Sequence, residues 1–292
     1  MSIPLRLLVV EHERDTGIAF VGERLEHNGV ELHTVGPQIG VALPGSLAGY
    51  DGLVVLGGTM GPTDDEQHPH LPGTRALIDE ALEAGLPLLA ICLGGQLVTE
   101  ARGGLVAPSP TPEIGCWTVQ LTDAGRADRV FGGLPDAMPV LQWHFLEMVD
   151  LPEGAVVLST SPRCRHQLYR LGDRAWATQL HLEGTPALGA SWAAGNEADV
   201  AAYGPGDACT GVAVSDAPDD VAASRSRNST GGMVAGEWAG AEAAVDVFLS
   251  AMRTHEAAMR EHWGGCVDRF VEVCQEVRAQ APSSRGETPL AP

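Results

Sequence analysis

The chain has 292 residues, of which 44% are hydrophobic, so it can bury a full core in one large domain or in one domain with an appendage. Its formal net charge is -20 at pH 7, from 38 acidic residues against 18 Lys and Arg residues, and all 18 are Arg. Such a surface repels phosphate backbones and anionic lipids, so neither a nucleic acid nor a membrane is expected as a partner. The absence of Lys, with abundant Ala, Gly and Pro, is typical of a GC-rich bacterial genome.

The six cysteines are scattered, without a C-x-x-C pair or the dense spacing of a disulfide scaffold. This distribution favours a reduced, cytoplasmic setting. The apolar run from Leu5 to Val10 is too short for a signal sequence and leads at once into charged residues. No apolar stretch reaches about 18 residues, so neither export nor a membrane span is expected.

Short apolar runs alternate with helical stretches over the first hundred residues. Brief, Val-rich and Leu-rich runs are typical of strands buried on both faces, and Gly residues mark the ends of the helices. Strands are predicted at Leu5–Val10, Val30–Val35, Leu53–Leu56 and Leu86–Ile91, and helices at Thr16–Asn28, Pro72–Ala84 and Gly94–Arg102. This alternation predicts an α/β fold with a mostly parallel central sheet flanked by helices.

From Gly115 to Leu182 the pattern changes to short β-type runs separated by turn residues. No linker separates them from the first half, so an antiparallel extension of the same sheet is expected. The predicted strands are Cys116–Leu121, Val140–His144, Ala155–Ser159, His166–Arg170 and Ala175–His181.

The remaining chain divides by composition. Residues 1–192 are expected to form one catalytic domain, and residues 193–240, rich in Gly, Ala, Asp and Ser, a partly disordered loop or insertion. Residues 241–280 carry apolar side chains at three- and four-residue steps, which predicts a C-terminal helical appendage, as one helix or as two that break at Gly264-Gly265. Residues 281–292 are expected to form a disordered tail.

Cys92 follows the apolar run Leu88–Ile91 and precedes Gly94 and Gly95. A strand, a reactive side chain and a glycine-containing helix start form the context of a nucleophile elbow, in which a tight turn exposes the side chain above the sheet. The positive end of the helix dipole favours the thiolate there. Taken alone, a Cys is more often a small buried hydrophobe, and it is the context that favours catalysis.

A base for this thiol is found in the segment that ends in His181 and Glu183. If the segment is a strand, these two side chains project from one face, because side chains alternate. Glu183 would then orient the imidazole, and His181 would move protons between Cys92 and the leaving group. The other histidines show no spacing typical of a metal site, so no metal and no cofactor are expected.

Gly57 and Gly58 follow the strand Leu53–Leu56, where a bare backbone can approach a substrate and offer N–H groups. The N–H of Gly58 and that of Leu93 are expected to form an oxyanion hole.

These three blocks, Cys92-Leu93-Gly94-Gly95-Gln96, Gly57-Gly58 and the segment Gln179–Glu183, resemble the signatures of the class I (triad) glutamine amidotransferase family. The resemblance covers about Leu5 to Trp192. It implies the family's flavodoxin-like fold, with Cys92 as nucleophile, His181 and Glu183 as its partners, Gly58 and Leu93 as oxyanion donors, and Gln96 as a contact to bound glutamine. Trp143-His144 resembles a pair found near the glutamine pocket of stand-alone members.

Two positions depart from the family pattern without removing a reacting atom. Leu182 stands where Pro is frequent, and Ala90 where Gly is frequent. No part of the chain resembles a synthetase or acceptor domain, so an ammonia-accepting synthase would be a separate partner.

Three functions remain open from the sequence. The first is hydrolysis of the glutamine side-chain amide through a γ-glutamyl thioester, with ammonia passed to a synthase. The second is hydrolysis of γ-glutamyl peptides or isopeptides by the same triad. The third is a non-catalytic regulator that uses the fold to bind a partner, which the intact Cys92, His181 and Glu183 disfavour.

Overall fold

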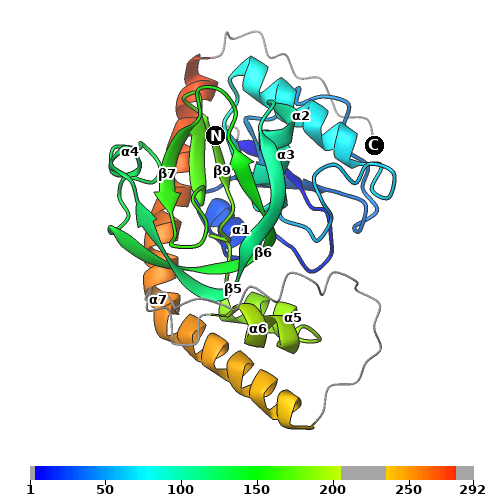
Figure 1. Ribbon diagram of the computed structural model, residues 1–292. Coiled ribbons are helices and arrows are strands. Elements are labelled where there is room, and N and C mark those ends of the chain that lie inside the picture. The colour runs from blue at the N-terminus through cyan, green and yellow to red at the C-terminus, as the bar shows by residue number, and fades with distance from the viewer. Residues whose placement is uncertain (1–3, 205–234, 281–292) are drawn as a thin grey trace.

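The computed structural model describes residues 4–204 and 235–280 (Figure 1). Within them, nine strands form one mixed sheet in the order β2-β1-β3-β4-β9-β8-β7-β5-β6. The strands are β1 Arg6–Val10, β2 Glu31–Val35, β3 Gly52–Val55, β4 Leu88–Ile91, β5 Leu105–Leu121, β6 Ala137–Asp150, β7 Val156–Thr160, β8 Leu168–Leu171 and β9 Ala175–Thr178. The half from β2 to β9 is parallel and the half from β9 to β6 is antiparallel, which confirms the predicted α/β sheet with an antiparallel extension.

Helices cover both faces of this sheet (Figure 1). Helices α2 and α3 pack on one face, and α1 and α7 pack on the other. The helices are α1 Ala19–His27, α2 Leu71–Ala84, α3 Leu93–Ala101, α4 Asp123–Arg126, α5 Pro186–Ala193, α6 Glu197–Tyr203 and α7 Ala235–Gln280. No helix in these ranges combines the length and the apolar content needed to cross a membrane.

Alternating side chains of the parallel strands pack into two separate hydrophobic cores, one on each face of the sheet. Leu7 and Val9 of β1 point toward α1 and α7, whereas Leu8 and Val10 point toward α2 and α3. Successive side chains of a strand lie on opposite faces, so a strand that is covered on both sides must be apolar throughout. Burial on both faces explains the continuous apolar runs in the sequence. The parallel pairing of β3, β4 and β9 places the carboxyl ends of these strands side by side.

Of the two arrangements expected for residues 241–280, the structure forms the single helix, because α7 runs without interruption from Ala235 to Gln280. The alternative pair of helices with a break at Gly264-Gly265 is not formed. The helix continues through the two glycines because the residues on either side, Trp263 and Cys266, are buried in the core. Helix α7 thus packs into the same core as the sheet.

The expected loop at residues 193–240 is wrong in part. The structure forms α6 from Glu197 to Tyr203, and α7 begins at Ala235. Ala-rich and Glu-rich sequence has high helix propensity, and Val200 is buried in the core, so tertiary packing stabilises a short helix there. The remainder of that expected loop, and the expected tail at 281–292, lie outside the described residues.

Candidate active site

Cys92 occupies the sharp turn between β4 and α3. Its backbone has φ 52° and ψ -107°, a left-handed conformation that is rare for a residue with a side chain. Two hydrogen bonds fix the turn: the N–H of Cys92 donates to the carbonyl of Thr178 at 2.7 Å, and its carbonyl accepts from the N–H of Gln96 at 2.9 Å. The geometry is that of a nucleophile elbow at the carboxyl edge of the sheet.

The glycines after Cys92 let α3 lie close to the strand ends. A Cβ on Gly94 would stand 2.3 Å from the carbonyl oxygen of Val55, and one on Gly95 would stand 2.6 Å from that of Thr178. Both distances lie far inside van der Waals contact with backbone atoms. Glycine is therefore required at both positions for a steric reason.

His181 and Glu183 meet in a turn, not on a strand. Strand β9 ends at Thr178, so the expectation that side-chain alternation pairs them is wrong. The N–H of His181 donates to the carbonyl of Leu141 at 3.0 Å, and the N–H of Gly184 closes the turn on the carbonyl of His181 at 3.1 Å. Within this turn Nδ1 of His181 lies 2.7 Å from Oε1 of Glu183.

The charge of His181 depends on its two neighbours. Burial alone would lower the pKa of this imidazole, but the carboxylate of Glu183 and the sulfur of Cys92 outweigh it and raise the pKa to about 10. The Nε2 atom is buried and has no hydrogen-bond partner among the described residues. Since Nδ1 is bound to Glu183, a proton on Nε2 is available for transfer.

A chain of aromatic contacts runs from this imidazole to α7. The ring of Trp192, at the end of α5, meets His181 edge-on with centroids 4.7 Å apart. Trp143 packs against Trp192 at 5.9 Å and against Phe248 of α7 at 6.4 Å. These contacts hold α5 and α7 over the site, and only the Trp143-His144 pair hinted at them in the sequence.

The glycines after β3 lie next to Cys92 and His181. A Cβ on Gly57 would stand 3.1 Å from Cε1 of His181 and 3.5 Å from Cβ of Cys92. The N–H of Gly58 makes no hydrogen bond to any described residue. Leu93 is the first residue of α3, where an N–H has no partner within the helix. Two backbone donors thus remain open beside the sulfur.

Gln96 is 3% exposed and contacts another glutamine. Its Nε2 donates to Oε1 of Gln179 at 3.3 Å, and Nε2 of Gln179 lies 3.6 Å from Sγ of Cys92. The expected contact between Gln96 and substrate remains a prediction, since the amide of Gln96 is engaged by Gln179. The sequence places Gln179 in a signature block but gives no local pattern from which its contact with Cys92 could be predicted.

Two histidines lie close together beside the Gly57-Gly58 turn. Nδ1 of His12 is 2.9 Å from Nε2 of His70. Burial, followed by repulsion from His70 and His68, lowers the pKa of His12 to about 3, so this ring is neutral. Its Cβ would be 3.2 Å from a Cβ on Gly58. The neutral ring of His12 therefore belongs to a residue that packs against the Gly57-Gly58 turn. The position of His12 in the sequence did not predict this contact.

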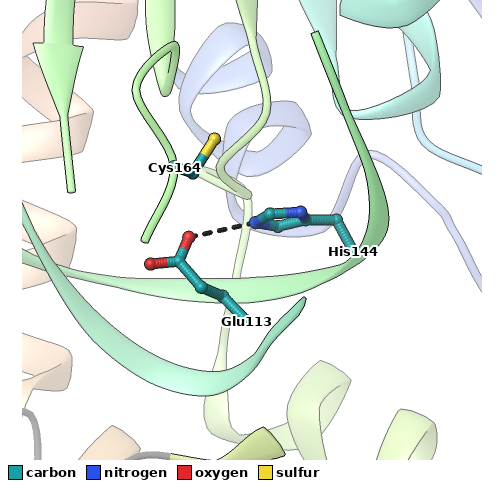
Figure 2. A group of neighbouring side chains, drawn as sticks. All are labelled: Glu113, His144 and Cys164. Carbon is teal, nitrogen blue, oxygen red and sulfur yellow. Dashed lines mark hydrogen bonds and ion pairs between the residues drawn. The ribbon is translucent and has the colours of Figure 1, made fainter. Parts of the chain in front are cut away.

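A second polar cluster lies under the antiparallel half of the sheet. Glu113, His144 and Cys164 place one potential metal-ligand atom each within 4.8 Å of one another (Figure 2). Both ring nitrogens of His144 and both carboxylate oxygens of Glu113 already have partners in the chain. Burial and the charge of Glu113 also raise the pKa of the Cys164 thiol far above its usual range. The group is therefore a closed hydrogen-bonding network.

The other free cysteines among the described residues have thiols of raised pKa. Cys164, Cys266 and Cys274 are free but buried, and burial raises the pKa of the Cys266 thiol to about 12. Thiols of this kind are poor nucleophiles. Cys116 is disulfide-bonded, which departs from the reduced setting expected from the sequence.

A family model described as glutamine amidotransferase class-I matches residues 18–193, which is more than half of the chain. The chain therefore belongs to this family, as its signature blocks predicted. The match begins before α1 and ends with α5, so it includes the elbow, the Gly57-Gly58 turn and the turn at His181.

Curated relatives and solved structures agree with this assignment. A glutamine amidotransferase-like protein of Salmonella typhimurium, YfeJ, is 32% identical over 184 residues, which cover 62% of this chain and 77% of that protein. A glutamine-hydrolysing GMP synthase component of Thermoplasma acidophilum is 33% identical over 138 residues, 47% of this chain and 65% of that protein.

A glutamine amidotransferase of Thermotoga maritima has the same fold. It matches with a TM-score of 0.72 at 21% identity, over 93% of this chain and 100% of that one. A second, from Methylobacillus flagellatus, gives a TM-score of 0.69 at 22% identity, over 92% and 94% of the two chains.

Proposed function

We propose that the chain hydrolyses the side-chain amide of glutamine, with Cys92 as nucleophile and His181 and Glu183 as its partners. The observation that carries this proposal is the 2.7 Å contact between His181 and Glu183 together with the buried, unpartnered Nε2 of the same ring. An imidazole held at one nitrogen and open at the other is suited to proton transfer. The family to which the chain belongs supports the choice of glutamine.

The first half of the reaction forms a thioester. The sulfur of Cys92 attacks the carboxamide carbon, and the N–H groups of Gly58 and Leu93 stabilise the negative oxygen of the tetrahedral intermediate. Loss of one such donor costs about 3 to 4 kcal/mol in comparable sites. The carbon–nitrogen bond then breaks, and His181 gives its Nε2 proton to the departing ammonia.

The second half releases glutamate. A water molecule gives a proton to Nε2 of His181 and attacks the γ-glutamyl thioester, and the sulfur leaves as a thiolate. Glu183 keeps the ring oriented through both halves by accepting from Nδ1. The raised pKa of His181 means that the ring carries its proton at neutral pH and can give it to the departing ammonia.

We further propose that the ammonia passes to a synthase on another chain. The support is that relatives of this chain include a glutamine-hydrolysing component of a GMP synthase. Free glutamine is preferred over a γ-glutamyl peptide because Cys92 is only 5% exposed and the ring of Trp192 packs against His181. A peptide would need an open groove at this sulfur.

Replacement of the nucleophile tests the proposal. Cys92→Ala is expected to abolish ammonia release from glutamine without change in the far-ultraviolet circular dichroism spectrum, because only one sulfur atom is lost. Ammonia release is measured with free glutamine and with a panel of γ-glutamyl amides, which separates the two substrate classes. A folded Cys92→Ala protein that still releases ammonia would refute the assignment.

Labelling provides an independent check. The glutamine mimic 6-diazo-5-oxo-norleucine is expected to modify Cys92 and to spare Cys164, Cys266 and Cys274, which are buried thiols of raised pKa. Mass mapping of the adduct decides between them. An adduct on one of the other three would move the nucleophile elsewhere.

A further inference from the structure

Gln179 lies immediately after β9 and is fully buried. Its side-chain Nε2 is 3.6 Å from Sγ of Cys92, a distance suited to a sulfur acceptor, whose radius exceeds that of oxygen. An amide N–H that points at a sulfur in a water-excluded site stabilises negative charge on that sulfur. Hydrogen bonds to an ionised partner are about twice as strong as those between neutral groups.

The orientation of this amide is fixed by its other end. Oε1 of Gln179 accepts a hydrogen bond from Nε2 of Gln96 at 3.3 Å. Because the oxygen is engaged by a donor, the NH₂ group is the end that faces Cys92. Gln96 and Cys92 belong to the same turn and helix, so both ends of the Gln179 side chain contact the elbow.

The backbone also ties the two segments together. The N–H of Cys92 donates to the carbonyl of Thr178 at 2.7 Å, and the N–H of Gln179 donates to the carbonyl of Gln167 at 2.8 Å. Strands β4 and β9 are paired in parallel up to Ile91 and Thr178. Cys92 and Gln179 therefore leave the sheet side by side, and little freedom remains in the distance between them.

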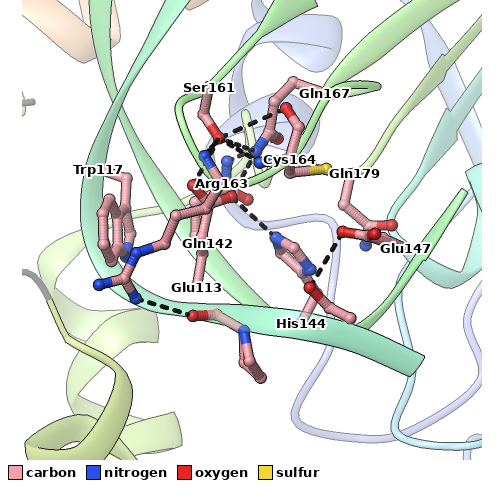
Figure 3. Close-up of polar contacts among 12 residues, drawn as sticks. Glu113, Trp117, Gln142, His144, Glu147, Ser161, Arg163, Cys164, Gln167 and Gln179 are labelled. Carbon is pink, nitrogen blue, oxygen red and sulfur yellow. Dashed lines mark hydrogen bonds and ion pairs between the residues drawn. The ribbon is translucent and has the colours of Figure 1, made fainter. Parts of the chain in front are cut away.

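A buried polar network supports Gln167 from behind (Figure 3). The amide of Gln167 donates to Oε2 of Glu113 and accepts from Nε2 of Gln142 at 2.7 Å. Glu113 also accepts from Oγ of Ser161 at 2.6 Å. The carboxylate is completely buried and is compensated on both oxygens, which is the condition under which a buried charge is tolerated.

His144 completes this network. Its Nδ1 donates to the carbonyl of Leu146 at 3.0 Å, since a carbonyl can only accept, and its Nε2 lies 3.0 Å from Oε2 of Glu113. Every member of the group is thus held by at least one other. Oε1 of Gln142 is buried without a hydrogen-bond partner among the described residues. The remaining contacts restrain Gln167, which lies just before β8 and whose carbonyl accepts from the N–H of Gln179.

From these contacts we propose that Gln179 is a further catalytic residue: its side-chain amide donates to the Cys92 sulfur and favours the thiolate over the thiol. The network of Glu113, His144 and Gln167 holds it in place and acts as a positioning group. The proposal rests on the proposed function in one respect, that Cys92 is the nucleophile. It does not depend on which amide is the substrate.

Alkylation of Cys92 by iodoacetamide across a range of pH tests this role, because only the thiolate reacts. Gln179→Leu keeps the approximate size of the side chain and removes the donor. Gln179→Glu keeps the size more closely and places a carboxylate against the sulfur. Both are expected to move the midpoint of the rate–pH profile to higher pH, Glu further than Leu. The midpoint for Leu is expected to rise by about one pH unit, which is a tenfold change in the thiol–thiolate equilibrium, as befits loss of a hydrogen bond to a charged group.

Thr99→Val is the matched control. Thr99 is buried in α3, where its hydroxyl donates to the carbonyl of Gly95 at 2.9 Å. Its replacement removes a buried hydrogen bond of the same core without touching the sulfur. It is expected to lower the thermal midpoint while the alkylation midpoint stays at the wild-type pH. A purely structural role of Gln179 would give the same result for Gln179→Leu.

The outcomes separate this proposal from the proposed function. A folded Gln179→Leu protein with the wild-type midpoint and rate overturns the role of Gln179 alone. Wild-type protein that neither releases ammonia nor forms the diazo-ketone adduct on Cys92 overturns the proposed function. If Gln179→Leu does not fold, its adducts map to Cys266 and Cys274 as well, and Gln179→Glu then decides: an unchanged midpoint in that variant also overturns the proposal.

Discussion

The charge on His181 is set by three opposing effects that are large compared with thermal energy. Burial favours the neutral ring, whereas Glu183 at 2.7 Å and the sulfur of Cys92 favour the imidazolium. The two attractions win and raise the pKa to about 10. An imidazolium that persists through neutral pH is suited to act as the general acid in the proposed reaction.

This sets the alkaline limit of activity. A protonated His181 is required, so kcat is expected to fall as pH rises through about 10, not near the ordinary histidine value of 6.5. Glu183→Gln removes the largest effect that raises the pKa, so the alkaline limb should move to lower pH and kcat should fall. The measurement is ammonia release against pH for both proteins.

Glu26→Gln, at an exposed site on α1, is the control and should leave the profile unchanged. A wild-type profile that already declines near pH 7 would contradict the raised pKa. An alkaline limb that stays in place in Glu183→Gln would assign the shift to some other group.

Residue types and spacing singled out Cys92, His181 and Glu183, because a nucleophile elbow and a base with its carboxylate leave distinct local patterns; the structure shows the turn at Cys92 and the His181–Glu183 contact, and the catalytic roles stay a prediction. The way in which His181 and Glu183 meet was not predictable, since an i, i+2 pair has the same spacing on a strand and in a turn. The roles of Gln179 and Trp192 were missed for another reason. Their contacts join segments far apart in the chain, so the local hydrophobic pattern of the sequence does not predict them.

At the scale of elements, α3 lies closer to the sheet than a helix with side chains on its first turn could. Gly94 and Gly95 face carbonyl oxygens of β3 and β9. These oxygens belong to backbone that is fixed by strand pairing and cannot move aside. The first turn of α3 is thus specified by the absence of side chains.

Gly94→Ala should therefore destabilise the protein strongly. The new Cβ would stand 2.3 Å from the carbonyl oxygen of Val55, and α3 would have to shift away with Cys92 at its start. Overpacking of this kind costs about 1–3 kcal/mol or more, and loss of activity should exceed loss of stability. Urea unfolding and ammonia release measure the two effects.

Gly45→Ala offers a comparison at an exposed loop position where a Cβ would meet no atom within 4 Å. Its unfolding free energy should stay within about 0.5 kcal/mol of the wild type. Equal stability of the two variants would show that α3 can move without cost.

The order of the strands followed from the sequence, whereas their lengths and the short helices α4, α5 and α6 did not. Strand β5 begins at Leu105, well before the expected Cys116, and includes three Pro residues that argue against a strand. Its pairing with β6 is irregular between Pro108 and Glu113, and the ladder continues past that point. Tertiary pairing thus overrides local propensity in this segment.

At the scale of the whole molecule, α7 joins the sheet in one core. The ring of Phe270 meets that of Trp176 on β9 edge-on at 6.1 Å, and Asp268 pairs with Arg24 of α1 through two short contacts. Near its other end, Phe248 packs over Gly189 of α5. Helix α7 therefore contacts both β9 and α5, the helix that carries Trp192 against His181.

Phe270→Ala is expected to cost about 3–5 kcal/mol, because the residue is 1% exposed and its loss leaves a cavity against Trp176. Val247→Ala, on the same helix but 42% exposed, should change the unfolding free energy by about 0.5 kcal/mol or less. Denaturant unfolding gives both values. A small effect of Phe270→Ala would contradict the packing of α7 into the core.

Strand β9 is the last strand among the described residues, yet it lies in the middle of the sheet, between β4 and β8. During synthesis the thiol leaves the ribosome long before the segment that carries its imidazole, and the gap between β4 and β8 stays open until β9 enters it. Sheets closed by such distant segments form late in folding. An unfinished chain would thus expose a cysteine of ordinary reactivity, and amide cleavage would begin only when the final strand is inserted.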